Sequence, residues 1–281
     1  MPRYKLTIVV DNSAPHPTRL LAEYGFALLL EDLELNKIIL FDTGATGHTL
    51  LHNLELLGVS PQDIDYIVLS HRHYDHTGGL VELLKARRGR PIDVIAHPDL
   101  FVPAYSSLGG VLRYIGVPFT REALEGLGAR LLLVKKGIKI TDNIMTSGEI
   151  PRRWGPEHTN GMLRLENGEL REDHILDDNA LYVKTEKGLF VVTGCGHAGV
   201  ENIISYGLKL TGQNTLYGIV GGLHLLGASI ERLKEITEFL VSKKPKIVAA
   251  LHCSGPLPQY PLSEKLGRAY VLAGVGSKIE I

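Results

Sequence analysis

The sequence lacks the features that would assign it to a secreted or membrane class. Its 281 residues include only two cysteines, Cys195 and Cys253, whereas a secreted disulfide scaffold would carry more. The N-terminus has no signal-peptide core, because Asp11-Asn12 interrupts the apolar run. The most apolar stretch, 216–228, is shorter than the roughly 20 residues of a membrane span. We therefore expect a soluble cytoplasmic protein with no membrane partner.

The chain also lacks an excess of charge of either sign. Thirty lysines and arginines against 31 aspartates and glutamates give a net charge of −1 at pH 7, which provides no electrostatic footprint for nucleic acid. There is no repeat of solenoid period, and no glycine-rich phosphate loop follows the first strand, which argues against a dinucleotide-binding fold. We expect a small-molecule substrate, and the sequence does not indicate an oligomeric state.

Apolar runs separated by turn residues predict an α/β (α+β) fold in which helices face sheet layers. The middle of the chain, 98–165, is rich in glycine and proline. We expect it to be a substrate-covering insertion within a single domain that spans 1–281. The expected strands are 6–10, 26–30, 37–41, 64–69, 92–96, 130–134, 138–141, 180–185, 188–193, 216–220, 246–251, 269–272 and 278–281, and the expected helices are 48–57, 78–86, 200–209 and 229–242.

The strongest signal is a run of metal-ligand side chains directly after an apolar strand. In extended chain His71 and His73 point the same way, so both can bind one metal ion. As the chain turns towards the next helix, Asp75 and His76 swing round to face the same pocket. Imidazole nitrogen and carboxylate oxygen suit a borderline divalent ion. The sequence therefore predicts a metal site here.

Three strand ends in the second half of the chain carry the same residue types. Cys195 and His197 follow one strand, His224 follows a second, and His252 with Cys253 follows a third. Each alone could be a buried cysteine or a loop histidine, but ligands gathered at one sheet edge are expected for chemistry. The segment 70–76 supplies at most four ligands. We therefore predict that it is half of a two-metal site, closed by His252 and Cys195.

Other polar residues are weaker candidates. Asp42 ends a strand, and we expect it to hold a ligand histidine or the loop rather than a metal. The pair Asp177-Asp178 precedes a strand and either caps a turn or brings Asp178 to the metals. Arg152 and Arg153 are either phosphate anchors for the substrate or an exposed basic pair.

Together these motifs resemble the metallo-β-lactamase superfamily. The pattern His-x-His-x-Asp-His is met at 71–76, the FDTG segment at 41–44 matches its first motif, and His252 its last. The segments SGEIPR (147–152) and TGCGHAG (193–199) narrow the resemblance to one subfamily. That subfamily is labelled 7,8-dihydropterin-6-yl-methyl-4-(β-D-ribofuranosyl)aminobenzene 5′-phosphate synthase, or metal-dependent hydrolase of β-lactamase superfamily II.

The resemblance implies a four-layer αββα sandwich with two divalent metal ions at one edge. Cys195 stands where many members have an aspartate that bridges the metals; a cysteine favours zinc, with manganese or iron as alternatives. Many members also have a histidine where this chain has Asp177-Asp178, so Asp178, His197 or His224 would complete the site. Arg72 stands where the subfamily often has glycine, and it would either attract an anionic substrate or face solvent.

Three functions follow from this resemblance. The first is a dinuclear hydrolase that cleaves a phosphate or carbonyl ester-type bond through a metal-bound hydroxide. In it Asp75 orients the nucleophile, and His197 or His224 donates a proton. The second is a pterin diphosphate-dependent transferase, the synthase of methanopterin-type cofactor biosynthesis. The third is a non-hydrolytic redox or sensor metalloprotein.

Overall fold

The computed structural model describes residues 2–14 and 18–281. Within them the chain forms two compact units. Unit 1 comprises Met1–Val134, Asn160–Asp177 and Gly274–Ile281, and unit 2 comprises Lys135–Thr159 and Asp178–Ala273. The predicted covering segment 98–165 is therefore divided, with 135–159 in unit 2 and the remainder in unit 1.

Unit 1 is built on a seven-stranded sheet whose first strands are antiparallel and whose later strands are parallel. A tight turn reverses the chain between the antiparallel strands β2 and β3. The Asp32 carboxylate stabilises this turn by accepting hydrogen bonds from the backbone of Glu34 and Leu35. In spatial order the strands are β16 (Lys278–Glu280), β1 (Tyr4–Val10), β2 (Ala27–Asp32), β3 (Lys37–Phe41), β4 (Tyr66–Val68), β5 (Ile92–Ala96) and β8 (Ala129–Leu133).

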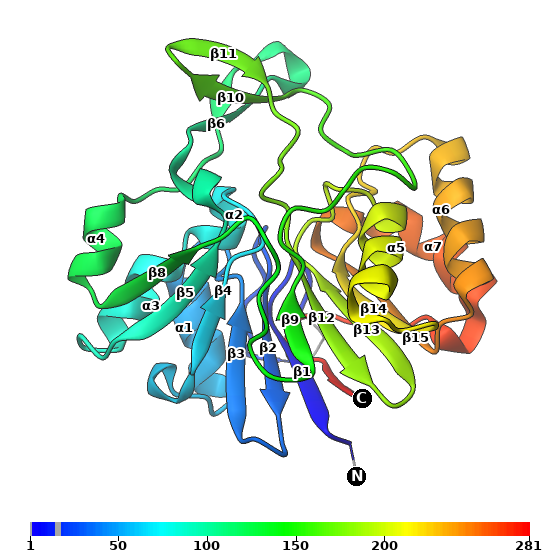
Figure 1. Cartoon of the computed structure of the whole chain (residues 1–281), viewed down its shortest axis with the longest axis horizontal. Coiled ribbons are helices and arrows are strands. Elements are labelled where there is room, and N and C mark those ends of the chain that lie inside the picture. The colour runs from blue at the N-terminus through cyan, green and yellow to red at the C-terminus, as the bar shows by residue number, and fades with distance from the viewer. Residues whose placement is uncertain (1, 15–17) are drawn as a thin grey trace. The chain divides into compact units, whose positions relative to one another are not determined.

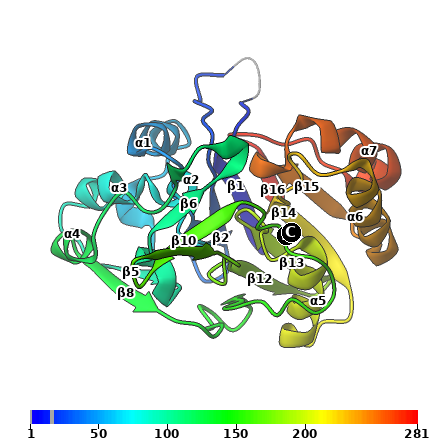
Figure 2. The same ribbon diagram turned by 90° about the horizontal axis from the view of Figure 1, so that it is seen from above.

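Three helices cover one face of this sheet: α1 (Gly47–Leu56), α3 (Leu80–Ala86) and α4 (Arg121–Gly126) (Figures 1 and 2). Thr46 caps α1 by accepting from the backbone of Thr49. Leucines on the inner side of the helices pack against alternate residues of the strands, and burying them is what holds this layer in place. The shared core includes Leu50, Leu54, Leu80, Leu83, Leu84, Leu124, Leu29, Leu40, Ile67 and Val94.

A smaller four-stranded sheet also belongs to unit 1 (Figure 1). Its order is β11 (Glu169–Glu172), β10 (Met162–Glu166), β6 (Ala104–Ser106) and β7 (Arg113–Tyr114). All four strands pair antiparallel. The sheet thus joins two segments, 104–114 and 162–172, that lie far apart in the sequence.

Unit 2 has a five-stranded sheet in which β13, β14 and β15 are parallel neighbours. The helices α5 and α6 make the crossovers between them, as parallel strands require, so the carboxyl ends of the three strands meet at one edge. The order is β15 (Ile247–Leu251), β14 (Leu216–Gly222), β13 (Gly188–Thr193), β12 (Ala180–Thr185) and β9 (Ile144–Thr146). The helices α5 (Val200–Thr211), α6 (Ile230–Lys243) and α7 (Pro256–Leu266) share its core.

The predicted fold class is confirmed, because each unit has one large sheet with a layer of helices on it, as an αββα fold requires. Two predicted strands were wrong. Residues 138–141 form a tight turn in which Ile140 and Thr141 bond back to Ile144, too short for a strand. Residues 269–272 make only one bridge, from Tyr270 to Val248. The sequence analysis did not predict α7, which contains Pro261. Among the described residues, no helix has both the length and the apolar character to cross a membrane.

Candidate metal centre

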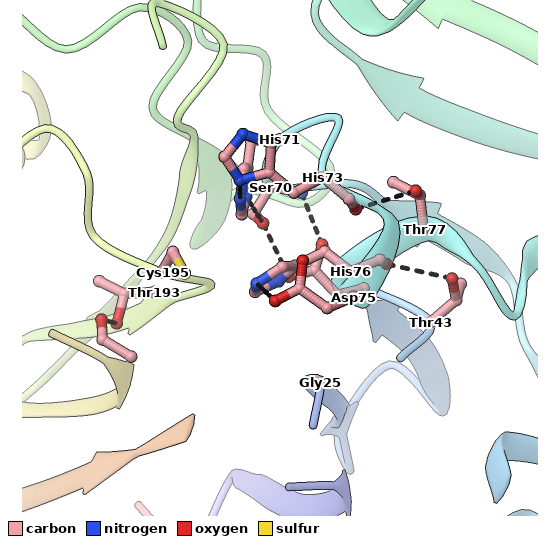
Figure 3. A network of polar contacts seen from close by, with 12 residues as sticks. Gly25, Thr43, Ser70, His71, His73, Asp75, His76, Thr77, Thr193 and Cys195 are labelled. Carbon is pink, nitrogen blue, oxygen red and sulfur yellow. Dashed lines mark hydrogen bonds and ion pairs between the residues drawn. The ribbon is translucent and has the colours of Figure 1, made fainter. Parts of the chain in front are cut away.

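The predicted ligands of unit 1 lie together and are buried. His71 and His73 follow β4, and Asp75 and His76 lie in the short helix α2 (Tyr74–Thr77), as expected for a chain turning after a strand (Figure 3). The Nε2 atom of His71 is 3.0 Å from Nδ1 of His73. Two imidazole nitrogens on one tetrahedral zinc ion would lie about 3.3 Å apart. Nε2 of His76 lies 3.7 Å from a carboxylate oxygen of Asp75.

Burial lowers the pKa of His73 to about 4, since the carboxylates of Asp75 and Asp177 do not offset the loss of solvation. The imidazole is therefore neutral at pH 7. Neutral imidazole is the form that binds a metal ion.

Asp42 supports this cluster from the end of β3. One carboxylate oxygen accepts from the backbone of Ser70 at 2.7 Å. The other accepts from the Ser70 hydroxyl and from Nδ1 of His76, each at 2.7 Å. Because Asp42 holds Nδ1 of His76, Nε2 is the nitrogen that would bind a metal. Asp42 has a positive φ of 60°, a conformation uncommon outside glycine.

The segment after His76 lies against the chain that follows β3. A Cβ atom at Gly78 would lie 2.1 Å from the carbonyl oxygen of Ala45, and one at Gly79 would lie 2.2 Å from that of Thr43. No side chain fits at either position. The backbone of Thr43 donates to the carbonyl of His76 at 2.7 Å. Glycine therefore permits the close approach that brings Asp42 to the histidines.

Arg72 stands between two of the predicted ligand histidines and is fully buried, so the alternative that it faces solvent is wrong. Its guanidinium donates to the carboxylates of Asp177 and Asp173, and its backbone N–H donates to Asp177 at 2.9 Å. Burial raises the pKa of Asp173; at Asp177 the same effect is outweighed by the charge of Arg72 and by its hydrogen bonds, which leave the pKa lowered. The three side chains tie the ligand loop to the segment 173–177.

The predicted ligands of unit 2 also come together, at the carboxyl ends of its three parallel strands. The ligand atoms of Cys195, His197 and His224 lie within 4.8 Å of one another. So do those of Cys195, His252 and Cys253. The sulfur of Cys195 belongs to both groups, and all of these residues are buried except His224, which is half-buried. Unit 2 therefore offers sulfur and imidazole donors in one place.

Strained backbone holds two of these residues. His224 and His252 have positive φ angles of 48° and 47°. Non-glycine residues rarely adopt this conformation, and they concentrate at functional sites where the surrounding structure enforces it. Burial would raise the pKa of the Cys253 thiol, but hydrogen bonds with Cys195 and His224 and the nearby imidazoles lower it well below its usual value. A low pKa favours the thiolate, which is the form that binds metals.

Asp178 and the two arginines have other contacts. A carboxylate oxygen of Asp178 accepts from the backbone of Ala198 at 2.7 Å, which supports the loop after His197. Arg152 pairs with Glu157 at 3.3 Å, and Arg153 is exposed. Metal binding by Asp178 and phosphate binding by the arginines stay predictions.

Two residues beside the clusters, His158 and Asp173, were not predicted from the sequence. The ring of His158 lies 6.1 Å from that of His224, and its carbonyl accepts from Nδ1 of His197 at 2.9 Å. Burial is the main cause that lowers the pKa of His158 to about 4. His158 stands in an irregular segment without periodicity, and Asp173 is 101 residues from its partner Arg72, so no local signal identified either.

The similarity of this chain to known proteins covers much more of the sequence than these clusters. The sequence matches the family model of the Metallo-beta-lactamase superfamily over residues 22–171. It is 33% identical over 263 residues to the 7,8-dihydropterin-6-methyl-4-(beta-D-ribofuranosyl)-aminobenzene-5'-phosphate synthase of Methanocaldococcus jannaschii, covering 89% of this chain and 87% of the relative. A second relative from that organism, the uncharacterized protein MJ0448, is 34% identical over 252 residues, covering 89% of this chain and 90% of the relative. The solved structure of Tm1679, described as a metal-dependent hydrolase of the beta-lactamase superfamily, matches with a TM-score of 0.84 at 27% identity and covers 99% of both chains.

Proposed function

Because this chain belongs to the metallo-β-lactamase superfamily, we propose that it is a dinuclear metal-dependent hydrolase that cleaves a phosphate or carbonyl ester-type bond. The observation that carries the proposal is the pair of ligand clusters, which are buried and combine imidazole, thiol and carboxylate donors. The chain is an enzyme, and the open choice is between a hydrolase and a synthase.

The donor sets fit divalent metal ions of the zinc type. The proposed ligands in unit 1 are His71, His73, Asp75 and His76, and those in unit 2 are Cys195, His252 and Asp178. Together these two ligand sets would bind the enzyme's two metal ions. When bound, two such ions lower the pKa of a water molecule and polarise the substrate's oxygen atoms. Nitrogen and sulfur donors favour zinc over manganese, and iron is the alternative.

The chain's own residues supply orientation and proton transfer. Asp42 fixes the tautomer of His76 and aligns Ser70 with His71, so the ligand geometry is set before substrate binds. Asp75 would orient the nucleophile. His197 and His224, whose rings lie 4.2 Å apart, are the candidates to donate a proton to the leaving group.

The proposed substrate is a small anionic molecule. Arg153 is exposed on the loop that Asn202 holds, and it is the better candidate of the two arginines for a phosphate, because Glu157 already pairs with Arg152. Tyr105 and Tyr114 stack edge to face in unit 1, at 5.4 Å between ring centroids. They are candidates to contact a flat ring.

The comparison with the M. jannaschii synthase favours a second candidate function. It is 33% identical over 89% of this chain, whereas Tm1679 is 27% identical. As a synthase, this chain would bind the diphosphate of a pterin methyl diphosphate and assist its departure, and an aromatic amine with a ribose phosphate would attack the methylene carbon. In both functions the metal ions would bind oxygen atoms of the substrate, so one active site could serve either.

The decisive experiment assays the metal-loaded protein against phosphodiesters, phosphomonoesters, lactones, thioesters and β-lactams. We expect hydrolysis of one class, abolished by chelator and by the substitution His73→Ala. His48→Ala is the control, because His48 is exposed on α1. A fully loaded protein that cleaves nothing in the panel would refute the hydrolase. Diphosphate release that requires the aromatic amine would establish the synthase instead.

A further inference from the structure

Cys253 lies at the carboxyl end of β15, next to a ligand that the sequence predicts. It is buried, and both its thiol and that of Cys195 are free of disulfide bonding. The ligand atoms of Cys195, His252 and Cys253 lie within 4.8 Å of one another. Two thiolates on one tetrahedral zinc ion would lie about 3.8 Å apart. The spacing of the sulfurs is therefore compatible with one shared ion.

We propose that Cys253 is a metal ligand and that unit 2 binds its ion through two thiolates, those of Cys195 and Cys253, together with imidazole. This inference rests on the proposed function and specifies the kind of metal that the enzyme holds. A set of two sulfurs with histidine selects thiophilic ions such as zinc or iron(II). Magnesium and manganese prefer oxygen donors and would be poor occupants.

The surrounding backbone is arranged so that two sulfurs fit. Gly222, at the end of β14, separates the two cysteine segments. A Cβ atom there would lie 2.6 Å from the sulfur of Cys253, 3.0 Å from Cα of Cys195 and 2.3 Å from the carbonyl oxygen of Gly194. Its φ is not positive, so glycine is required here by space rather than by backbone conformation. Any side chain at 222 would displace the Cys253 sulfur.

Hydrogen bonds fix the Cys253 segment to its neighbours. The hydroxyl of Ser254 accepts from the backbone of Leu223 at 3.0 Å, and the carbonyl of Cys253 accepts from the backbone of Leu226 at 3.0 Å. The sulfur of Cys253 contacts the carbonyl oxygen of Cys195 at 3.2 Å. If Cys253 had only a structural role, its contact with the Cys195 carbonyl would be its one function. A serine hydroxyl at 253 could make the same contact, so Cys253→Ser separates that role from metal binding.

Cobalt(II) substitution tests the inference by a spectroscopic signature. Cobalt bound by thiolate absorbs in the near ultraviolet, with an intensity that increases with the number of thiolates. We expect this absorption in the wild-type protein and about half of its intensity in Cys253→Ser and in Cys195→Ser. The double variant should show no thiolate absorption. Ser254→Ala is the control, because it removes a buried hydrogen bond of the same segment without removing a sulfur. Its absorption should equal that of the wild type.

X-ray absorption at the zinc edge of the wild-type protein supplies a second measurement that does not depend on a variant folding. The signal averages over both ions of the chain, so two sulfurs on the ion in unit 2 give an average of about one sulfur per zinc, at about 2.3 Å. An average of about half a sulfur per zinc, or a cobalt absorption unchanged in Cys253→Ser, would overturn the inference while the protein still binds metal and turns over substrate. A wild-type protein that binds no metal would overturn the proposed function itself.

Discussion

Replacing Arg72 by methionine is a sharp test of how the ligand loop of unit 1 is held. Arg72, Asp173 and Asp177 are all buried, and the guanidinium binds both carboxylates. The substitution Arg72→Met keeps most of the side-chain volume but leaves two carboxylates without their cation. Breaking a buried ion pair by removing one partner costs about 3–5 kcal/mol. At about 2–4 °C per kcal/mol for a domain of this size, the melting temperature should fall by roughly 6–20 °C.

The stability deficit of Arg72→Met should depend on pH. In the wild type, the lowered pKa of Asp177 stabilises the fold above about pH 4, and this contribution is lost as the pH falls through the folded-state pKa. Without Arg72, the largest cause that offsets burial is gone, so we expect the pKa of both carboxyl groups to rise above their unfolded values. Such groups destabilise the fold at neutral pH, and less so as they become protonated. The deficit should therefore be larger at pH 7 than at pH 5.

The assay is urea unfolding of metal-free protein, followed by circular dichroism in the presence of chelator, so that metal binding does not contribute. The control is Arg121→Met, since Arg121 forms an exposed pair with Glu125 at 3.6 Å. An exposed pair contributes about 0–1 kcal/mol. If Arg72→Met lost no more stability than the control, or if its deficit grew as the pH fell, the account of the buried triad would be refuted.

Three further substitutions test other contacts. Asp42→Asn should weaken metal binding about 10–100-fold, because an amide has one oxygen, whereas two different oxygens of Asp42 accept from the Ser70 backbone N–H and from His76. Competition with a chromophoric chelator measures the affinity, and an unchanged affinity would contradict the assigned role. Asn202→Ala removes the acceptor of three backbone N–H groups at 153–155, so we expect a loss of about 1–3 kcal/mol and a shifted emission of Trp154, the single tryptophan; an unmoved spectrum would count against it. Gly222→Ala should cost about 1–3 kcal/mol in urea unfolding, because the added Cβ overlaps Gly194, and a neutral result would show that the strand ends can move apart.

Much of the fold could be predicted from the sequence because its signals are local. The strands β3, β12 and β13 agree with the predicted limits at both ends, since each is an apolar run bounded by turn residues. The strand predicted at 138–141 does not form. β-branched residues favour a strand in any context, but a strand also needs a neighbouring strand to pair with. The helix α7 was not predicted because Pro261, which lies at its middle, suggests a break in a helix.

The clustering of the candidate ligands was predictable, because the strand ends concentrate histidine and cysteine. Their supporting residues were less so. Asp42 was predictable from its place at a strand end, and the structure brings it to His76. The burial of Arg72 could not be predicted from the sequence. Its partner Asp173 lies 101 residues away and follows the edge hairpin of a separate small sheet. Contacts of this kind follow from tertiary packing, which no local pattern encodes.

We propose that this chain holds two metal ions at the residues named above. Elemental analysis of the purified protein, reconstituted with excess zinc and then freed of unbound ion, tests it most directly. The account predicts two ions per chain in the wild type and in His48→Ala, and fewer in both His73→Ala and His252→Ala. One ion or none in the wild type, or two ions retained in both ligand variants, would contradict it.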